Sequence, residues 1–316
     1  MKVLVTGATG LVGTALTRLC LENNLEVNYL TTRKDKVTSV NGAQGFYWNP
    51  TSNDIDITCF EGVSAIINLA GASIAKRWTK NYKEEIRTSR INSIVTLRKG
   101  LEKCNVRSIK SFVSASAIGI YPNSLSDYYL EDAQEIDDSF LGEVVQQWEE
   151  EIDSLTKFNF NIAKIRIGLV LSCKGGALPS MVKPVRNYVG AAFGTGEQWQ
   201  SWIHIEDLAR LFLFAVQNEL QGVYNGVAPN PVTNVRLTKE IASVLKKPLV
   251  LPNIPQIMMK GILGEMSYLL FASQRVSSKK IEDSGFNFEH KNICNALEDL
   301  FQAEEKSDSI YNKEYV

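Results

Sequence analysis

The sequence has few of the residues that build metal centres and disulfide frameworks. Its 316 residues include only two histidines, His204 and His290, and five cysteines. The cysteines are odd in number, far apart and never arranged as Cys-x-x-Cys: Cys20, Cys59, Cys104, Cys173 and Cys294. We therefore expect no metal site and no disulfide framework, and the pattern fits a reducing compartment.

Neither sign of charge dominates, and no apolar run is long. Lys and Arg number 34 and Asp and Glu 35, which leaves no general basic field for nucleic acid or an anionic membrane. No uninterrupted apolar run has membrane-spanning length, and the opening MKVLVTGATG reaches glycines before a signal-peptide core can form. With 44% hydrophobic and 22% charged residues, we expect a globular cytoplasmic protein whose partner is a small molecule, not nucleic acid or a membrane.

A glycine-rich turn stands near the start of the chain. Lys2–Thr6 reads as a buried strand, and an amphipathic helix and a second strand, Glu26–Leu30, follow the turn. Gly7 permits a tight turn, Gly10 lets backbone amides approach a diphosphate, and Gly13 lets the helix pack closely on the sheet. The N-terminus of the helix then points free N–H groups at the phosphates. This strand–turn–helix–strand unit predicts a dinucleotide-binding site.

The residues after the second strand favour one cofactor over the other. NAD-preferring sites usually carry an acid there, whereas this chain has Thr31, Thr32 and Arg33. Arg33 offers a planar donor fork suited to a 2′-phosphate, so NADP(H) is favoured. The alternative is a surface arginine beside the lysines of the next loop, Lys34 and Lys36.

Strand-like and helix-like segments alternate through the first half of the chain. Further strands are predicted at Val63–Asn68, Lys110–Ser114 and Asn161–Ile167, with helices at Lys80–Cys104 and Ser139–Leu155. This order is typical of an α/β fold with a doubly wound parallel Rossmann sheet.

The pattern changes near residue 171. We predict an NADP-binding Rossmann domain over 1–170 that also receives part of 203–228, a smaller α/β C-terminal substrate lobe over 171–302, and a polar tail over 303–316 that frays.

Two features of the second lobe allow more than one interpretation. Trp202 and His204 either line an apolar cleft with one polar handle or alternate along a core strand, and the core interpretation is slightly favoured. The apolar segment Gln256–Ala272 fits a lid, a homodimer surface or a core helix, and Lys260 and Glu265 exclude a membrane helix.

The segments TGATGLVG, NLAG and SASAIGIY together resemble the extended short-chain dehydrogenase/reductases, the epimerase-dehydratase group. More specifically, the chain resembles an atypical epimerase-family subgroup that has its own C-terminal domain. The other matching segments run in order to about residue 300: 77–79, 89–91, 166–168, 175–178, 198–204, 225–229, 264–266, 273–276 and 285–288.

The resemblance implies a set of residues that hold NADP(H). They are Gly7, Thr9, Gly10, Leu11, Val12, Thr32, Arg33, Leu69, Ala70, Gly71, Glu85, Arg90 and Val170. Val170 would line the nicotinamide end, and Arg90 stands where many extended relatives carry an Asn. Glu85 and Arg90 are five residues apart, so they do not share one stripe of a helix. A solvated charged face accounts for Glu85 equally well, whereas for Arg90 we favour the site.

The resemblance also implies a catalytic serine, and Ser116 matches its position. The usual partners are a Tyr and a Lys one helical turn apart, which together move a proton during hydride transfer. Here these positions read Phe140 and Val144, so the relay is absent. Among the nearby tyrosines, Tyr121 is expected to be structural, and the pair in the acidic loop 126–138, at 128 and 129, to be solvated.

Two functions fit these patterns. The first is an NADP(H)-dependent, epimerase-like oxidoreductase in which Ser116 orients the carbonyl or hydroxyl of a small polar substrate. The second is a non-catalytic NADP(H)-binding sensor or regulatory protein of the same fold, which the missing relay keeps open.

Overall fold

The computed structural model describes residues 1–314, and the chain divides into two compact units. The first unit consists of Met1–Pro122, Glu131–Ile167 and Leu208–Gly226, and the rest of the described chain forms the second. The sequence analysis placed the boundary near residue 170, close to the passage between Ile167 and Gly168. It assigned residues 123–130 to the first domain, whereas they belong to the second unit.

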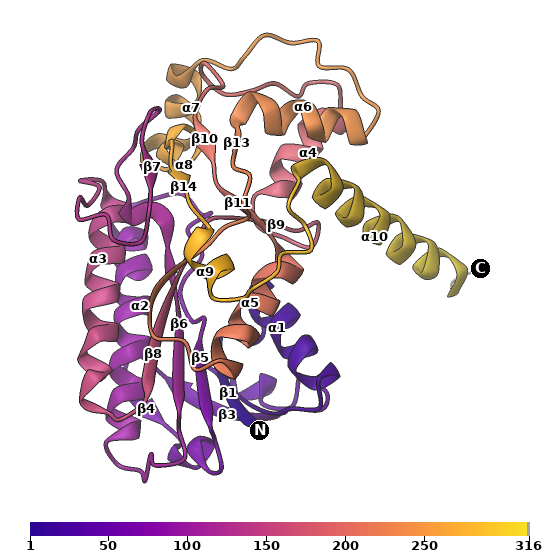
Figure 1. Ribbon diagram of the computed structural model, residues 1–316. Helices are drawn as coiled ribbons and strands as arrows, with labels where there is room; N and C mark the ends of the chain where they lie inside the picture. Colours follow the sequence, from indigo (N-terminus) through magenta and orange to yellow (C-terminus); the bar gives the residue numbers. More distant parts are fainter. Residues whose placement is uncertain (315–316) are drawn as a thin grey trace. The chain divides into compact units, whose positions relative to one another are not determined.

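An eight-stranded sheet forms the centre of the first unit (Figure 1). Neighbouring strands are parallel except for the last pair, which is antiparallel. In spatial order the strands are β12 (Gly222–Gly226), β8 (Asn161–Ile167), β6 (Ser111–Ala117), β5 (Ala65–Asn68), β1 (Lys2–Thr6), β2 (Glu26–Thr31), β3 (Gln44–Asn49) and β4 (Asp54–Ile55).

Helices cover both faces of this sheet, as a doubly wound fold requires. The helices α2 (Lys80–Leu101) and α3 (Phe140–Asp153) lie on one face, and α1 (Leu11–Glu22) and α5 (Ile205–Gln217) lie on the other (Figure 1). Short 3-10 helices occur at 34–36, 57–60, 118–120 and 154–157. Because both faces are covered, the central strands are near-continuous apolar runs, and Val3, Leu4, Val5, Ile66 and Ile67 are fully buried. The predicted fold class is confirmed.

The second unit contains three short two-stranded sheets. The strand pairs are β9 (Leu169–Leu171) with β11 (Trp202–His204), β10 (Trp199–Gln200) with β13 (Val232–Thr233), and β7 (Tyr128–Tyr129) with β14 (Arg275–Val276). Its helices are α4 (Leu178–Arg186), α6 (Asn234–Val244), α7 (Gln256–Leu263), α8 (Tyr268–Phe271), α9 (Lys279–Asp283) and α10 (Ile293–Glu314), with a 3-10 helix at 264–267.

The structure corrects the prediction for the C-terminal tail. Residues 303–314 continue α10 instead of fraying, and residues 315–316 lie outside the described part. The helix starts with a buried apolar stripe that includes Leu297, Leu300 and Phe301, and the Ala, Glu and Lys residues that follow are good helix formers.

The apolar segment Gln256–Ala272 is also not one helix. It breaks at Gly264, whose φ of 61° is strained for residues with a Cβ. Ile257 and Ile262 of α7 are 79% and 64% exposed, so the core-helix interpretation is wrong for α7. None of the helices in the described part of the chain is both long and apolar enough to span a bilayer.

Candidate functional site

The turn between β1 and α1 is built from three glycines with different tasks. A Cβ at Gly13 would lie 2.0 Å from the carbonyl oxygen of Gly7, and a Cβ at Gly7, where φ is +69°, would lie 2.9 Å from the Leu69 backbone. These two glycines are therefore required by the fold itself. Gly10 has an extended backbone, and a Cβ there would meet only the Gly7 oxygen, at 3.2 Å. Thr9 and Gly10 are exposed, so Gly10 keeps the surface of the turn free of a side chain.

The first turn of α1 has unused hydrogen-bond donors. Gly10 is the N-cap residue and offers no capping side chain, and the first turn contains no acidic residue. Leu11 and Val12 are the first residues of the helix, so their N–H groups have no carbonyl partner within it. Free N–H groups and the positive end of the helix dipole together attract an anion.

The end of β5 lies beside this turn. Thr6 Oγ1 accepts hydrogen bonds from the backbone N–H groups of Leu69 and Ala70, at 3.0 and 3.1 Å. A Cβ at Gly71 would lie 3.2 Å from the Arg90 side chain. The structure thus brings together Leu69, Ala70, Gly71 and Arg90, which the resemblance had placed around one cofactor.

The Arg90 side chain places a positive charge at this edge of the sheet. Its guanidinium lies over the ring of Trp148, 5.3 Å from the centroid, and Nη1 donates to the carbonyl oxygen of Ile86 at 2.8 Å. No described carboxylate forms an ion pair with it, and burial lowers the pKa of Arg90 to about 10. Glu85, on the same helix, is exposed and makes no hydrogen bond or ion pair with another described residue.

Thr32 and Arg33 follow β2 directly. The Arg33 fork is held by Asp35, with Nε 3.2 Å from Oδ1 and Nη2 2.6 Å from Oδ2. The hydrogen bond from Arg33 lowers the pKa of the Asp35 carboxyl. The sequence analysis missed this acid, although it stands two residues after the arginine that was expected to bind a 2′-phosphate.

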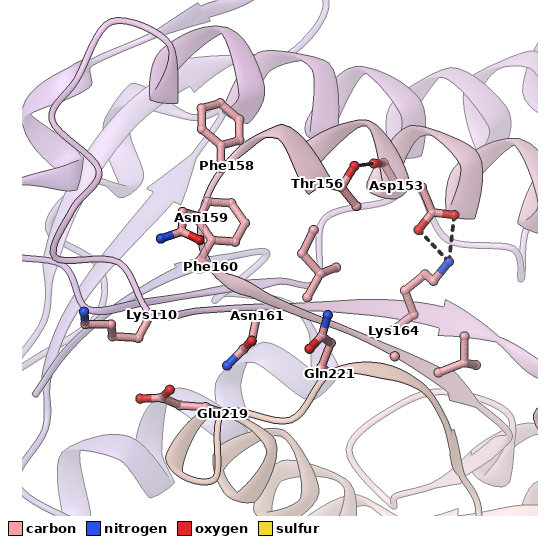
Figure 2. Close-up of a pocket in the computed structure, with 13 residues that line it drawn as sticks. Lys110, Asp153, Thr156, Phe158, Asn159, Phe160, Asn161, Lys164, Glu219 and Gln221 are labelled. Carbon is pink, nitrogen blue, oxygen red and sulfur yellow. Dashed lines mark hydrogen bonds and ion pairs between the residues drawn. The ribbon is translucent and has the colours of Figure 1, made fainter.

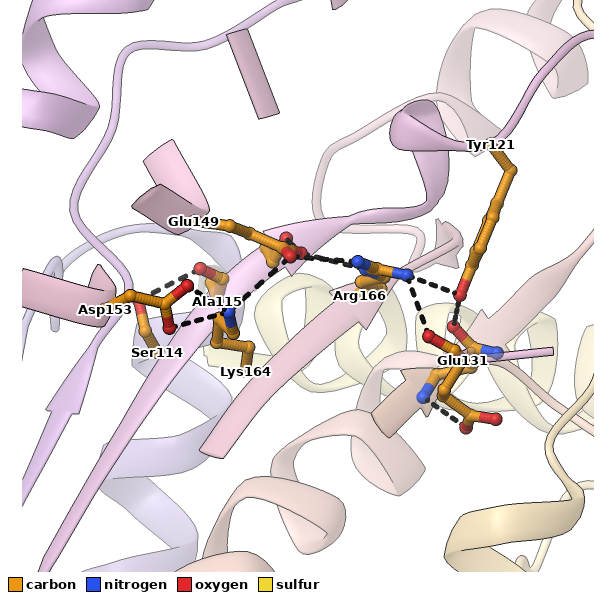
Figure 3. Close-up of polar contacts among 10 residues, drawn as sticks. Ser114, Ala115, Tyr121, Glu131, Glu149, Asp153, Lys164 and Arg166 are labelled. Atoms are coloured by element: carbon orange, nitrogen blue, oxygen red, sulfur yellow. Dashed lines mark hydrogen bonds and ion pairs between the residues drawn. The ribbon is translucent and has the colours of Figure 1, made fainter. Parts of the chain in front are cut away.

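Ser116, the predicted catalytic serine, is buried in β6 and is bonded to the polar network whose members Glu149, Arg166 and Tyr121 are labelled in Figure 3. Its hydroxyl donates to Glu149 Oε1 at 2.5 Å, and Arg166, its neighbour across the sheet, donates to both oxygens of Glu149 at 2.8 and 2.9 Å. The one hydroxyl proton of Ser116 is used in the hydrogen bond to Glu149. In this arrangement Ser116 can accept a hydrogen bond from a substrate hydroxyl but cannot donate one to a substrate carbonyl. Its catalytic role stays a prediction.

The network continues across the sheet toward β12. Arg166 Nη1 donates to the Tyr121 hydroxyl at 3.0 Å, and Tyr121 donates to Asn225 Oδ1 at 2.7 Å. Burial raises the pKa of Tyr121. Burial also works to raise the pKa of Glu149, but the hydrogen bonds and charge of Arg166 outweigh it and hold that pKa below its usual value. These contacts fit the expected structural role of Tyr121. The carboxylate that organises the network, Glu149, carried no recognisable motif in the sequence.

The two relay positions on α3 are filled by apolar packing. The Phe140 ring meets Trp78 edge-on with centroids 5.3 Å apart, and Lys83 Nζ lies 4.6 Å from the Phe140 centroid. Val144 is buried. Neither position carries a group that can transfer a proton.

The remaining predicted residues belong to the second unit. Val170 lies in β9 next to Ile203 of β11, and its place at the nicotinamide end stays a prediction. Trp202 and His204 are both buried in β11, which agrees with the core-strand interpretation. The Trp202 indole donates to the Asn230 carbonyl oxygen at 2.9 Å.

The two histidines of the chain stack on each other. The rings of His204 and His290 are 3.8 Å apart and 19° from parallel, and Asp299 Oδ2 lies 3.3 Å from His204 Nε2 and 3.7 Å from His290 Nε2. Burial lowers the pKa of His204 to about 4, and its Nδ1 accepts the N–H of Glu206, so the proton of the neutral ring is on Nε2. His204, His290 and Asp299 each have a ligand atom within 4.8 Å of the others, but the stacking of the two rings turns their nitrogens in nearly the same direction instead of toward one common point.

The acidic loop also differs from expectation. Tyr128 is 49% exposed, but Tyr129 is only 7% exposed, and both form β7 instead of a solvated loop. Val276 of β14 pairs with Tyr129 in a parallel ladder.

A pocket of about 530 Å³ opens at the other end of the sheet (Figure 2). Its wall includes Lys110 just before β6, Asn161 at the start of β8 and Gly222 at the start of β12. Lys164 on its wall is already paired with Asp153, at 2.8 Å. Ligands of open α/β sheets bind at the carboxyl ends of the strands, and this pocket lies at the amino ends.

The parallel sheet wound on both faces, with a glycine turn after β1, defines a Rossmann-type α/β protein. The profile of the NAD dependent epimerase/dehydratase family matches residues 3–139, and that of a domain of unknown function, DUF1731, matches residues 254–300. Epimerase family protein SERP0438 of Staphylococcus epidermidis is 36% identical over 311 residues, which cover 96% of this chain and 99% of the relative. The chain therefore belongs to the epimerase family, in the atypical branch with its own C-terminal domain.

Two solved structures are similar over nearly the whole chain. The human epimerase family protein SDR39U1 (isoform 2), solved with NADPH, is 29% identical with a TM-score of 0.84, and the match covers 95% of this chain and 99% of that one. A nucleoside-diphosphate sugar epimerase from Corynebacterium glutamicum is 28% identical with a TM-score of 0.74, covering 94% of this chain and 57% of that one.

Proposed function

We propose that this chain is an NADP(H)-binding, epimerase-like oxidoreductase that acts on a small polar substrate. The observation that carries the proposal is the turn after β1, where Gly10 keeps the surface open in front of free N–H groups of α1. The human relative solved with NADPH adds support.

The residues at the carboxyl ends of the strands fit a nicotinamide dinucleotide. The turn from Gly7 to Val12 would hold the diphosphate, and Leu69, Ala70 and Gly71 would border the ligand without long side chains. Arg90 would contribute a positive charge that no described carboxylate neutralises. When bound, the nicotinamide would supply or accept a hydride.

Replacing Gly10 tests the cradle directly. Gly10→Ala places a methyl group where the diphosphate is expected, and we expect NADPH affinity to fall at least tenfold, with a loss of stability that is smaller than in Gly13→Ala. Calorimetric titration with NADPH and NADH measures the affinity, and thermal unfolding checks the fold. Gly13→Ala is the contrasting variant, because its Cβ would collide with the Gly7 oxygen and stability itself should fall. Full NADPH affinity in Gly10→Ala would remove the diphosphate cradle from the proposal.

The preference for NADP(H) rests on Arg33. Its bond to Asp35 is exposed to water on both sides, so a 2′-phosphate would compete with a weak partner. We expect Arg33→Ala to narrow the ratio of NADPH to NADH affinity about tenfold, the size of one charge-assisted contact. Asp35→Asn is the companion variant. It removes the ion pair from the Arg33 guanidinium, so the ratio of NADPH to NADH affinity should stay the same or increase. An unchanged ratio in Arg33→Ala would remove Arg33 from the cofactor site.

A second function is favoured by a specific observation, the apolar packing at Phe140 and Val144. Without a Tyr-Lys relay, the chain would bind NADP(H) as a sensor or regulatory protein without turnover. Purified protein incubated with NADPH and a panel of carbonyl metabolites separates the two functions. Saturable loss of nicotinamide absorbance with one metabolite supports the oxidoreductase, and tight binding without any loss supports the sensor.

A further inference from the structure

Arg275 in β14 lies between two aromatic rings of the second unit. Its guanidinium carbon is 4.4 Å from the centroid of the Trp199 ring and 5.2 Å from that of Tyr128. Tyr128 is the partner of Arg275 in the β7–β14 pair, and Trp199 opens β10. Aromatic faces attract a guanidinium and hold its plane, so the direction of its N–H groups is largely set before any ligand arrives.

The backbone on each side of Arg275 is held in place as well. The Ser201 hydroxyl donates to the carbonyl oxygen of Gln274 at 2.8 Å and accepts the N–H of Val276 at 2.9 Å. One serine thus fixes the residues immediately before and after the arginine. The N–H of Trp199 is in turn bonded to Ser273 Oγ at 3.0 Å. Arginine and ring therefore lie on two short segments, 199–201 and 273–276, that are bonded to each other.

No described carboxylate balances the charge of Arg275, whose partners are the two aromatic rings. Arg275 is partly buried, its Nε is buried without a hydrogen-bond acceptor, and no described carboxylate lies within ion-pair distance. Other arginines of the same unit are paired, Arg186 with Glu304 and Arg236 with Glu240. A permanent cation that is half-buried without a counter-charge is suited to take up an anion.

A carboxylate near in sequence is engaged elsewhere. Asp127 precedes Tyr128, and its two oxygens accept hydrogen bonds from Ser126, at 3.2 Å, and Tyr129, at 3.5 Å. It makes no ion pair with Arg275.

We propose that Arg275 is the anion-recognition residue of the second unit and binds an oxyanion group, phosphate or carboxylate, of the small-molecule substrate. The planar fork suits two oxygens of one such group, and the rings of Trp199 and Tyr128 fix its plane. That the ligand is the substrate rests on the proposed function, whereas the anion site itself does not.

The test compares anion binding by wild type, Arg275→Gln and Arg275→Lys, with Arg236→Gln as the matched control for loss of a surface arginine. The probes are inorganic phosphate, diphosphate and malonate at constant ionic strength, followed by tryptophan fluorescence and calorimetry. Trp199→Phe assigns the fluorescence change to the ring beside Arg275. We expect saturable binding by wild type, at least a tenfold loss in Arg275→Gln, a smaller loss in Arg275→Lys and none in Arg236→Gln.

The result also assigns the class of ligand. Saturation by phosphate or diphosphate indicates a phosphorylated ligand, and saturation by malonate alone indicates a carboxylated one. Failure of all three probes to saturate the wild type overturns the proposal, as does equal affinity in wild type and Arg275→Gln. Thermal unfolding of Arg275→Gln and its NADPH affinity, which we expect to be unchanged, show that the variant is folded. Absence of NADPH binding to every variant would refute the proposed function and leave the anion site standing.

Discussion

Two polar regions of the first unit differ in whether their hydrogen-bonding groups have partners. We call the turn after β1 the open region and the network behind β6 the closed region. In the turn after β1, the first N–H groups of α1 have no capping side chain, and the glycine at their head leaves open space. In the network behind β6, the carboxylate of Glu149 meets the Ser116 hydroxyl and two donors of Arg166. Open donors at a surface mark a place for a ligand, whereas mutually satisfied buried groups mark a scaffold.

The two regions are joined through the sheet. Thr6, Asn68 and Ser114 are neighbours on β1, β5 and β6, and their side chains are bonded in a row at 2.7 and 3.1 Å. Ser114 is two residues before Ser116, so both side chains lie on the same face of β6. The row also supports the N–H groups of Leu69 and Ala70 through Thr6. The buried hydrogen bonds of this row therefore hold the backbone of Leu69 and Ala70 in place beside the open turn.

The largest expected effect comes from breaking the closed region. Glu149→Ala leaves the Arg166 guanidinium buried without its counter-charge, and we expect the free energy of unfolding to fall by about 3–5 kcal/mol. Urea denaturation measures the loss. Glu150→Ala, an exposed neighbour on the same helix, should change stability by less than about 0.5 kcal/mol. Equal stability of the two variants would mean that the network is not a scaffold.

The stacked histidine pair of the second unit predicts a dependence of stability on pH. His204 has a folded pKa of about 4, below its ordinary value of 6.5, so between these values the unfolded chain binds a proton that the folded chain does not. Stability is then complete above pH 6.5 and falls by about 3 kcal/mol as the pH drops toward 4. Denaturation at several pH values measures this slope. His204→Phe removes the titrating group and should lose that part of the slope, and an identical slope in wild type and variant would contradict the assignment.

The open region was largely predictable from the sequence, because its determinants are local. Lys2–Thr6 is a strand with the predicted ends, and glycine spacing placed the turn directly after it. Backbone geometry near a turn depends on residues that are neighbours in the chain. Asp35 lies outside the strand-end position where an acid marks NAD preference, yet the Arg33 side chain reaches it two residues further on.

The closed region could not be predicted in the same way. Ser116, Glu149, Arg166 and Asn225 come from four separate elements. The register between β6, β8 and β12 aligns the three strand residues, and the packing of α3 on the sheet adds Glu149. No spacing rule within one segment reports such a contact. Likewise β3 was not predicted, because QGFYWN lacks the long apolar run that marked the central strands.

The smallest expected change in stability is that of Ser116→Ala, a variant that tests whether Ser116 belongs to the closed or to the open region. Ser116→Ala removes one buried hydrogen bond to Glu149 while Arg166 keeps both of its own, so we expect a loss of about 1 kcal/mol in the free energy of unfolding. NADPH affinity should stay unchanged, because the open turn keeps all its donors; denaturation and calorimetry measure the two quantities. A tenfold loss of NADPH affinity at unchanged stability would place Ser116 in the open region instead. Where a substrate is found, loss of its turnover in Ser116→Ala at this small cost in stability would add a catalytic role, since the wild-type serine oxygen can accept a hydrogen bond from a substrate hydroxyl.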